Sequence, residues 1–294
     1  MTEPMYVYKL LDWIDKDNFD WSGLSLNPNA IQLLKENPEK IDWRKLSLNP
    51  NAIQLLEQNP EVINWYWLAS NPNGTKLLEI HPDKVNWDML SLNPNAIKLL
   101  ERCPNKINWG MLSLNPNAIQ LLEENPEKID WGSLSINMNA IHILEKNQEK
   151  IDWGMLSSNP NATQLLSKNL RKINWWRLSE NPGAIHILEK YPEKLNWYSL
   201  SLNPNAIHIL EKNPEKAIWC NMSSNLNAMH LLERNREKIN WHFLSMNPSI
   251  FKKEINYNFL KERMNIISEE LMMKCMHPSR LERWIEMGGD IDDF

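Results

Sequence analysis

Several classes of protein are excluded by what this sequence lacks. No stretch approaches the roughly 18 consecutive apolar residues of a membrane-spanning helix. The N-terminal segment has no basic stretch followed by an apolar core, which is the pattern of a secretory signal. We therefore expect a soluble, intracellular protein that is not secreted and has no membrane partner.

Cysteine and glycine are scarce as well. The 3 cysteines are odd in number and far apart, which is typical of reduced thiols and not of a disulfide framework. The 8 glycines form no phosphate-binding loop, and no His-x-x-x-His pair or nucleophile elbow is present. The net charge of −5 disfavours nucleic acid as a partner. We expect no catalytic activity, no cofactor, no metal and no small-molecule substrate.

What the sequence does contain is a repeat. Tryptophans from Trp21 to Trp241 follow one another every 22 residues without an insertion, and such regular spacing indicates a solenoid. Counted from each tryptophan as position 1, the unit is W-x-x-L-S-x-N-P-N-A-I-x-L-L-E-x-N-P-E-K-I-[DN]. Ten copies are complete, and the eleventh loses the pattern after Pro248.

The unit fits two folds, because its first half also satisfies the leucine-rich-repeat pattern. That pattern needs an apolar sixth position, whereas the sequence has Ser70, Ser158, Glu180 and Ser224 there. The fifth position is serine in every copy except Ala69. Positions 1, 4 and 5 recur together, which is the spacing of one helix face. The pattern therefore favours helices.

The polar residues of the unit mark where these helices begin and end. Aspartate or asparagine before every repeat tryptophan except Trp219 can cap a first helix. Asn115-Pro116 can start a second helix, and Asn125-Pro126 can stop it. The sequence predicts an all-α fold, an α-solenoid of tandem 22-residue helix-turn-helix repeats. Ten copies at about 8–10 Å each would form a curved rod on the order of 90 Å long.

Within this stack we expect an apolar core and bridging asparagines. Trp109, Leu112, Ile119, Leu122 and Ile129 and their counterparts are predicted to face inward. The asparagines at positions 7, 9 and 17 are predicted to cap turns and to bridge adjacent repeats.

The two ends of the chain are expected to cover the end repeats. We assign residues 1–20 to an N-terminal cap, residues 21–249 to ten complete repeats and a partial eleventh, and residues 250–294 to a helical C-terminal cap. The C-terminal cap is predicted to contain helices at about residues 251–264, 266–276 and 279–286, with Gly288-Gly289 closing the last.

The opening YKLLDWI, the copies of LSLNPNAIQLLEENPEKIDW and the closing HPSRLERWIEMGGDIDDF resemble repeat proteins found in many copies in the genomes of giant DNA viruses of protists, the mimivirus-like group. The resemblance covers essentially the whole chain. It implies a viral protein located in the host cytoplasm or in the virion. That family has no established biochemical activity, so the resemblance implies no mechanism.

Binding residues are sought where the copies disagree, at positions 2, 3 and 6 of the first helix. Tryptophan, tyrosine, arginine and methionine at such positions are typical of protein interfaces. Drift of an unconstrained surface would explain the same variation. The candidate binding residues are Arg44, Lys45, Tyr66, Trp67, Met111, Met155, Trp176, Arg177, Tyr198, His242 and Phe243.

Position 12 carries a column of histidines: His142, His186, His208 and His230. One repeat apart, they are too distant to share a zinc ion, so we interpret them as exposed helix residues. Positions 12 and 16 become more basic along the chain, which keeps an anionic partner such as RNA as an alternative.

We therefore predict a non-catalytic scaffold whose partner is a protein. The main alternative is a structural part of a virion, such as a minor capsid or cement protein. A modular RNA-binding array is the third reading, and it fits less well because the outward positions are often glycine, serine or methionine.

Overall fold

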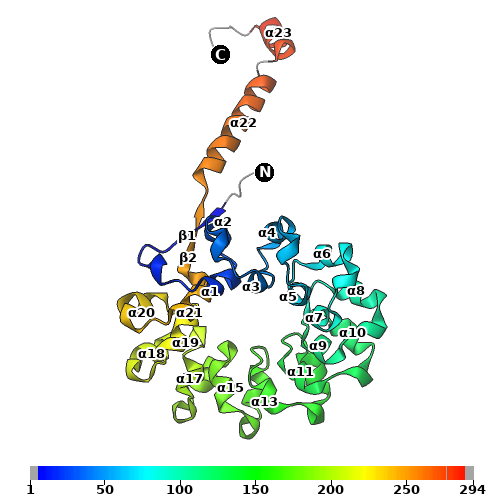
Figure 1. The fold of residues 1–294 in the computed structure, drawn as a ribbon, viewed down its shortest axis with the longest axis vertical. Helices are drawn as coiled ribbons and strands as arrows, with labels where there is room; N and C mark the ends of the chain where they lie inside the picture. The colour runs from blue at the N-terminus through cyan, green and yellow to red at the C-terminus, as the bar shows by residue number, and fades with distance from the viewer. Residues whose placement is uncertain (1–5, 276, 289–294) are drawn as a thin grey trace. The chain divides into compact units, whose positions relative to one another are not determined.

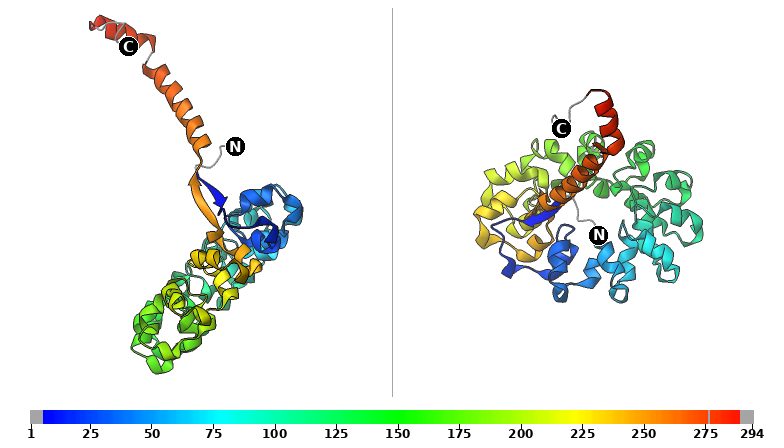
Figure 2. Two further views of the ribbon diagram at one scale, coloured as in Figure 1. Left: turned by 90° about the vertical axis from the view of Figure 1, so that its left-hand side faces the viewer. Right: turned by 90° about the horizontal axis from the view of Figure 1, so that it is seen from above.

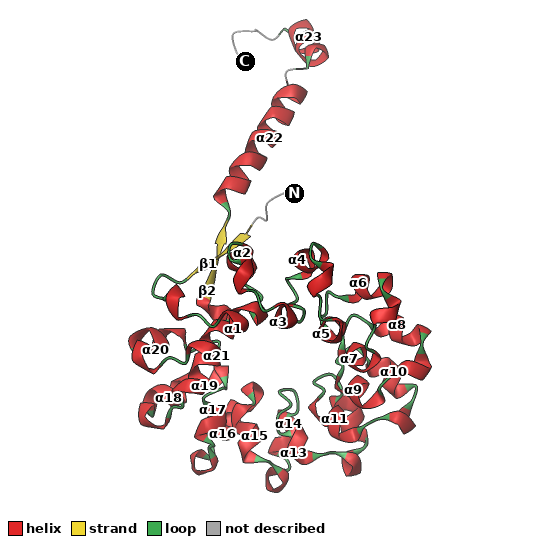
Figure 3. Ribbon diagram, viewed as in Figure 1, coloured by secondary structure: helices red, strands yellow, loops and turns green. Residues whose placement is uncertain are grey.

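The computed structural model describes residues 6–275 and 277–288. It divides into two compact units, Leu11–Ile250 and a smaller unit formed by Met1–Leu10 with Phe251–Phe294. Helices dominate, as Figure 3 shows, and no β-ladder links the described repeats, so the leucine-rich-repeat alternative is wrong. None of the helices within residues 6–275 and 277–288 combines the length and apolarity that a membrane crossing requires.

Each repeat has a first helix that begins at its tryptophan, a second helix, and a short 3-10 helix before the next repeat. The first helices are α1 (Trp21–Leu26), α3 (Trp43–Leu46), α5 (Trp65–Ser70), α7 (Trp87–Leu92), α9 (Trp109–Leu114), α11 (Trp131–Ile136), α13 (Trp153–Leu156), α15 (Trp175–Glu180), α17 (Trp197–Leu200), α19 (Trp219–Ser224) and α21 (Trp241–Met246). The second helices are α2 (Ile31–Lys35), α4 (Ile53–Glu57), α6 (Thr75–Ile80), α8 (Ile97–Arg102), α10 (Ile119–Glu123), α12 (Ile141–Lys146), α14 (Thr163–Ser167), α16 (Ile185–Leu188), α18 (Ile207–Lys212) and α20 (Met229–Arg234).

The 3-10 helices begin directly after position 17, which is asparagine in most copies. They are Pro38–Lys40, Pro60–Val62, Pro82–Lys84, Pro104–Lys106, Pro126–Lys128, Gln148–Lys150, Leu170–Lys172, Pro192–Lys194, Pro214–Lys216 and Arg236–Lys238, with Lys16–Asn18 near the N-terminus. Three more, Pro182–Ala184, Pro204–Ala206 and Pro248–Ile250, form at the corner between first and second helices. The helix bounds agree with the predicted stop at Asn-Pro, because the residue before proline is disfavoured in α conformation.

The repeats close into a ring, and the expected open rod is wrong. Figure 1 shows α7 and α9 on the inner side of the ring and α8 and α10 on its outer side. Neighbouring repeats pack most closely through their first helices, as α7 does on α9. Each repeat is thus a wedge that is narrower on the inner side of the ring than on the outer side, which makes the stack curve. Helix α1 packs on α21 as α7 packs on α9. In both views of Figure 2 the first residues of the ring, in blue, lie beside the last, in gold.

The eleventh repeat is assembled from both ends of the array. Residues 241–250 supply its positions 1–10, and residues 11–20 supply its positions 13–22. The Leu11 N–H donates to the Ile250 carbonyl at 2.9 Å, which repeats the bond from Leu55 to Ala52 within a complete copy. Residues 11–20, which the sequence assigned to a cap, thus complete a repeat.

A ladder of buried asparagines at position 7 joins the repeats. The Asn115 Nδ2 group donates to the carbonyls of Ser91 and Asn93 at 3.0 and 2.9 Å, and its Oδ1 accepts from the Asn117 N–H at 3.0 Å. Both bonds to the preceding repeat are made by every asparagine of the ladder: Asn27, Asn49, Asn71, Asn93, Asn115, Asn137, Asn159, Asn181, Asn203, Asn225 and Asn247. The predicted bridging role is confirmed.

The other two asparagine columns also bond as expected. At position 9, Asn117 donates to the Pro94 carbonyl of the preceding repeat at 2.9 Å. At position 17, Asn125 donates to the Leu121 carbonyl within its own repeat at 2.9 Å.

The serine at position 5 connects the first helix to the start of the next repeat in every copy except that of Ala69. Ser113 is fully buried, donates to the Trp109 carbonyl at 2.8 Å and accepts from the Asp130 N–H at 3.1 Å. A buried backbone N–H needs such a partner, so the serine is a structural requirement. Asp130 in turn caps the next helix through the Ser133 N–H at 2.7 Å, which confirms the predicted N-caps except at α19, where Ile218 makes no side-chain cap.

The core consists mainly of the leucines at positions 4 and 14 and the alanine at position 10. Leu112, Leu122 and Ala118 are all 0% exposed, and Ile129 is buried as predicted. Trp109 and Ile119 are only half-buried, so the expectation that each tryptophan faces the core is wrong.

The smaller unit begins with a two-stranded antiparallel sheet. Strand β1 (Tyr6–Leu10) pairs with β2 (Phe251–Ile255), with Tyr6 opposite Ile255. The predicted helix at 251–264 is therefore wrong in its first turn, because the paired segments alternate in side-chain direction as strands do. Helix α22 (Tyr257–Cys275) replaces the first two predicted helices, and most of its described side chains are exposed.

The last helix, α23 (Pro278–Glu286), matches the predicted one. Gly288 follows it with a φ of 90°, a conformation that glycine adopts without strain. Gly289 lies outside the described residues.

Candidate interaction surface on the first helices

The candidate binding residues divide into an outward group and a half-buried group. At position 2, Tyr66 and Trp176 are each 48% exposed and Tyr198 is 56% exposed; Arg44 and His242 are exposed too. The residues at position 3 are half-buried: Lys45, Trp67, Met111, Met155, Arg177 and Phe243. Among these candidates, position 2 is therefore the more exposed of the two positions.

Three candidates come together on repeats 2 and 3. The Arg44 guanidinium lies 5.9 Å from the centre of the Trp67 ring. The Tyr66 and Trp67 rings meet at 85° with their centres 5.0 Å apart. We call Arg44, Tyr66 and Trp67 the Arg44 patch. Cation–π and edge-to-face contacts hold these side chains in place before any partner arrives.

A second group lies on repeats 8 and 9. The Arg177 guanidinium is 5.7 Å from the centre of the Trp176 ring. On the next repeat, the Tyr198 carbonyl accepts a hydrogen bond from Asn221 Nδ2 at 2.8 Å. We call Trp176, Arg177 and Tyr198 the Trp176 patch. Figure 1 places α15 and α17 across the ring from α3 and α5, so the two patches lie on different arcs.

His242 and Phe243 belong to the closure of the ring. Their rings are 5.3 Å apart, and His242 Nδ1 forms a hydrogen bond with Asp20 Oδ2. Burial raises the pKa of Asp20, but hydrogen bonds from His242 and from the Gly23 and Ser22 N–H groups outweigh it, so this pKa lies below its ordinary value. Met111 and Met155 lie on α9 and α13, outside both patches.

The tryptophans at position 1 are covered by lysines of their own repeats. The Lys128 Nζ atom lies 4.5 Å from the centre of the Trp109 ring, and the same contact occurs at Trp21, Trp87, Trp131, Trp153, Trp197 and Trp219. At Trp65 and Trp175 the rings of His81 and Tyr191, respectively, meet the indole edge to face instead. These indoles stabilise the repeat and are less available to a partner than Tyr66 or Trp176.

The histidine column consists of exposed side chains, three of which pair with glutamates. His142, His208 and His230 each bond through Nε2 to a glutamate of the preceding repeat at 2.8–3.0 Å. Within the described part of the chain, no cluster of His, Cys, Asp and Glu has the arrangement of a metal site. Cys103 and Cys220 are half-buried free thiols.

No protein-family model, no curated protein and no solved structure matches the chain.

Proposed function

We propose that the ring is a non-catalytic scaffold that binds a protein partner through the Arg44 and Trp176 patches. The observation that supports this most is the preorganised group of Arg44, Tyr66 and Trp67, in which an exposed tyrosine, a half-buried tryptophan and a guanidinium are already in contact. Tryptophan, tyrosine and arginine contribute most of the binding energy in protein interfaces. Ordering them in advance lowers the entropy cost of binding.

The repeat gives a reason to treat these residues as a surface and not as packing. Around them, the leucines, serines and asparagines of the first helix are fixed by the core and the ladder. Position 2 belongs to neither the core nor the ladder, and Tyr66, Trp176 and Tyr198 are exposed there. Each patch carries an arginine, so we expect the partner to present acidic and apolar side chains together.

The test compares the wild-type ring with a Trp67→Ala/Trp176→Ala variant as immobilised bait in a cell lysate. Any protein retained by wild type is then purified and titrated against both. We expect the double variant to bind at least roughly tenfold more weakly. Met111→Ala/Met155→Ala is the matched control and should bind as wild type does. Equal affinity of the tryptophan variant and wild type would refute the proposal.

A further inference from the structure

One junction between repeats has a small side chain at a position where every other junction has a large one. Position 21 is occupied by a branched or aromatic residue in every other copy, namely Ile41, Ile63, Val85, Ile107, Ile129, Ile151, Ile173, Leu195, Ile239 and, in the eleventh repeat, Phe19. Most of these side chains are buried between repeats. At the junction of repeats 9 and 10 the residue is Ala217.

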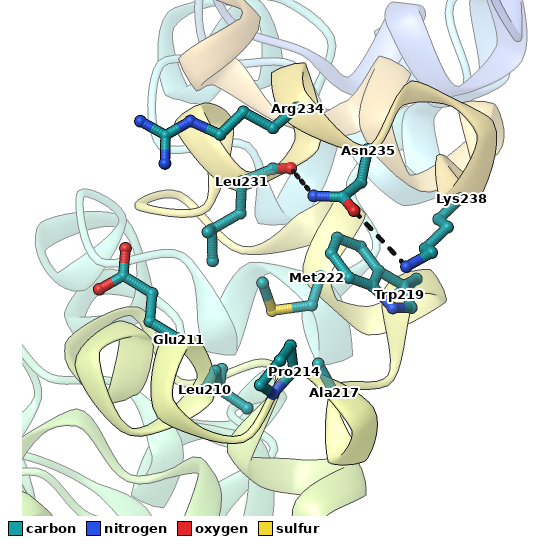
Figure 4. A pocket seen from close by; sticks show the side chains of 10 residues that line it. All are labelled: Leu210, Glu211, Pro214, Ala217, Trp219, Met222, Leu231, Arg234, Asn235 and Lys238. Carbon is teal, nitrogen blue, oxygen red and sulfur yellow. Dashed lines mark hydrogen bonds between the residues drawn. The ribbon is translucent and has the colours of Figure 1, made fainter.

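A cavity of about 320 Å³ lies at this junction. Leu210, Met222 and Leu231 form apolar walls, and Trp219 forms one side (Figure 4). Protein interiors are close-packed, so a methyl group in place of a branched side chain leaves unfilled space, which accounts for part of this volume. The volume is in the range of small-ligand pockets, about 300–1,000 Å³.

The charged side chains on the rim of the cavity differ in whether they have a partner. The Glu211 carboxylate is engaged by His230 Nε2 at 2.8 Å. The Lys238 ammonium lies 4.5 Å from the centre of the Trp219 ring and 3.5 Å from Asn235 Oδ1. Among residues 6–275 and 277–288, no carboxylate pairs with the Arg234 guanidinium. The rim therefore offers two cations, and neither forms an ion pair in the described part of the chain; Lys238 lies over the Trp219 indole and bonds to an amide oxygen.

We propose that this cavity binds a branched aliphatic group that carries a carboxylate. The aliphatic part takes the place of the missing position-21 side chain, against Leu210 and Leu231. The carboxylate bonds to Arg234 at the rim, where a guanidinium can hold it with two hydrogen bonds. Such a ligand is either the C-terminal isoleucine or leucine of a peptide or a small free acid. None of the lining residues belongs to the Arg44 or Trp176 patch, so this site is independent of the proposed function.

Isothermal titration calorimetry with the full chain tests the proposal. The probes are N-acetyl-isoleucine, a hexapeptide ending in isoleucine with a free carboxylate, and the same hexapeptide amidated at its C-terminus. We expect the free-carboxylate probes to bind and amidation to weaken the hexapeptide by roughly tenfold or more. If the hexapeptide binds more tightly than N-acetyl-isoleucine, the ligand is a chain end; equal affinity indicates a free acid. No binding of either acid overturns the proposal.

Two variants test the two halves of the site. Ala217→Ile restores the residue found in most other copies, so it should fold, raise the melting temperature and abolish binding. Arg234→Gln should weaken the free-carboxylate probes to the level of the amide. Unchanged binding of the acids to Ala217→Ile, or of both acid and amide to Arg234→Gln, overturns the proposal.

A transplanted cavity is the matched control. The variant Ala217→Ile/Ile107→Ala moves the void to the junction of repeats 4 and 5, where Glu124 occupies the position of Arg234. The walls there are Leu100, Leu112, Leu121 and Trp109, and Lys128 covers the indole as Lys238 does in the original site. We expect this cavity not to bind the carboxylate probes. Binding equal to that of wild type would overturn the role of Arg234.

Discussion

The Asn27 side chain donates a hydrogen bond to the Asn247 carbonyl at 2.9 Å, although 220 residues separate the two. The same bond spans 22 residues at every other rung of the ladder, as between Asn49 and Asn27. At the closure Asn27 also donates to the Ser245 carbonyl, and Asp20 N–H donates to Ser245 Oγ, each at 3.0 Å. The junction between the first and last repeats is thus built like the others.

Equivalence of the rungs predicts equal costs of mutation. Asn115→Asp should lower the free energy of unfolding at neutral pH by about 3 kcal/mol, because a buried carboxylate cannot donate to the two carbonyls. Asn27→Asp, at the closure, should cost the same to within about 0.5 kcal/mol. Urea denaturation measures both free energies of unfolding. Asn117→Asp, at the exposed position 9, should cost less. A much smaller cost at Asn27 would mean that the ring is open in solution.

Acid should weaken the closure selectively. Because the pKa of Asp20 is below its ordinary value of 3.8, the ionised carboxylate stabilises the fold above that value, and this contribution is lost as the pH falls through the lowered pKa. Asp20→Asn keeps the helix cap that asparagine provides in other copies. It should be less stable than wild type by roughly 0.5–1 kcal/mol near neutral pH, and the difference should shrink in acid.

The pH series is measured by urea denaturation of both proteins. In a His242→Gln background the same substitution should show a smaller pH dependence, since His242 is the largest of the contacts that lower the pKa. A difference that grows in acid would contradict the assignment.

Replacing glycine by alanine should have opposite effects on stability in α1 and in α11. A Cβ atom on Gly23 would lie 2.9 Å from the His242 carbonyl oxygen across the closure, whereas one on Gly132 would approach only Asp130 Oδ1, at 3.5 Å. Gly132→Ala should stabilise the protein by about 0.5–1 kcal/mol through helix propensity. Gly23→Ala should destabilise it, because backbone must shift. Thermal unfolding of the two variants gives the signs, and stabilisation by both would show that the closure is looser than the structure has it.

The single alanine at position 5 marks a place where a substitution should raise the stability of the ring. In repeat 3, Ala69 replaces the serine that bonds the position-22 N–H and the tryptophan carbonyl elsewhere. Ala69→Ser should supply both bonds, to the Asn86 N–H and the Trp65 carbonyl, and stabilise the ring by about 1 kcal/mol. Ser113→Ala should cost about 1–3 kcal/mol by the same reasoning. Loss of stability in Ala69→Ser would contradict this role of the serine.

The periodicity of the sequence predicted the local structure well. Tryptophan, leucine and serine at positions 1, 4 and 5 indicated a helix, and the cap at Asp130 and the bridge at Asn115 follow from residue chemistry. The inward tryptophan was wrong because an indole is amphipathic, and the lysine at position 20 covers its outer face.

Ring closure could not be derived from the repeat unit. Closure depends on a small angle between repeats, which accumulates around the stack and is set by how closely first helices such as α7 and α9 approach. A signal was present in residues 11–20, where Asp15, Phe19 and Asp20 stand in the places of the usual asparagine, isoleucine and aspartate. The cavity likewise had a signal in Ala217, the one small residue of its column.

The split eleventh repeat changes how the molecule can come apart. An open array frays from its ends, where each terminal module is held by one interface only. Joining residues 11–20 to residues 241–250 leaves no such module, so the first module to melt has to break contacts on two sides at once. The bond from Leu11 to Ile250 joins the two halves of the split repeat, and once these halves separate, the remaining repeats can unfold from free ends as a linear stack.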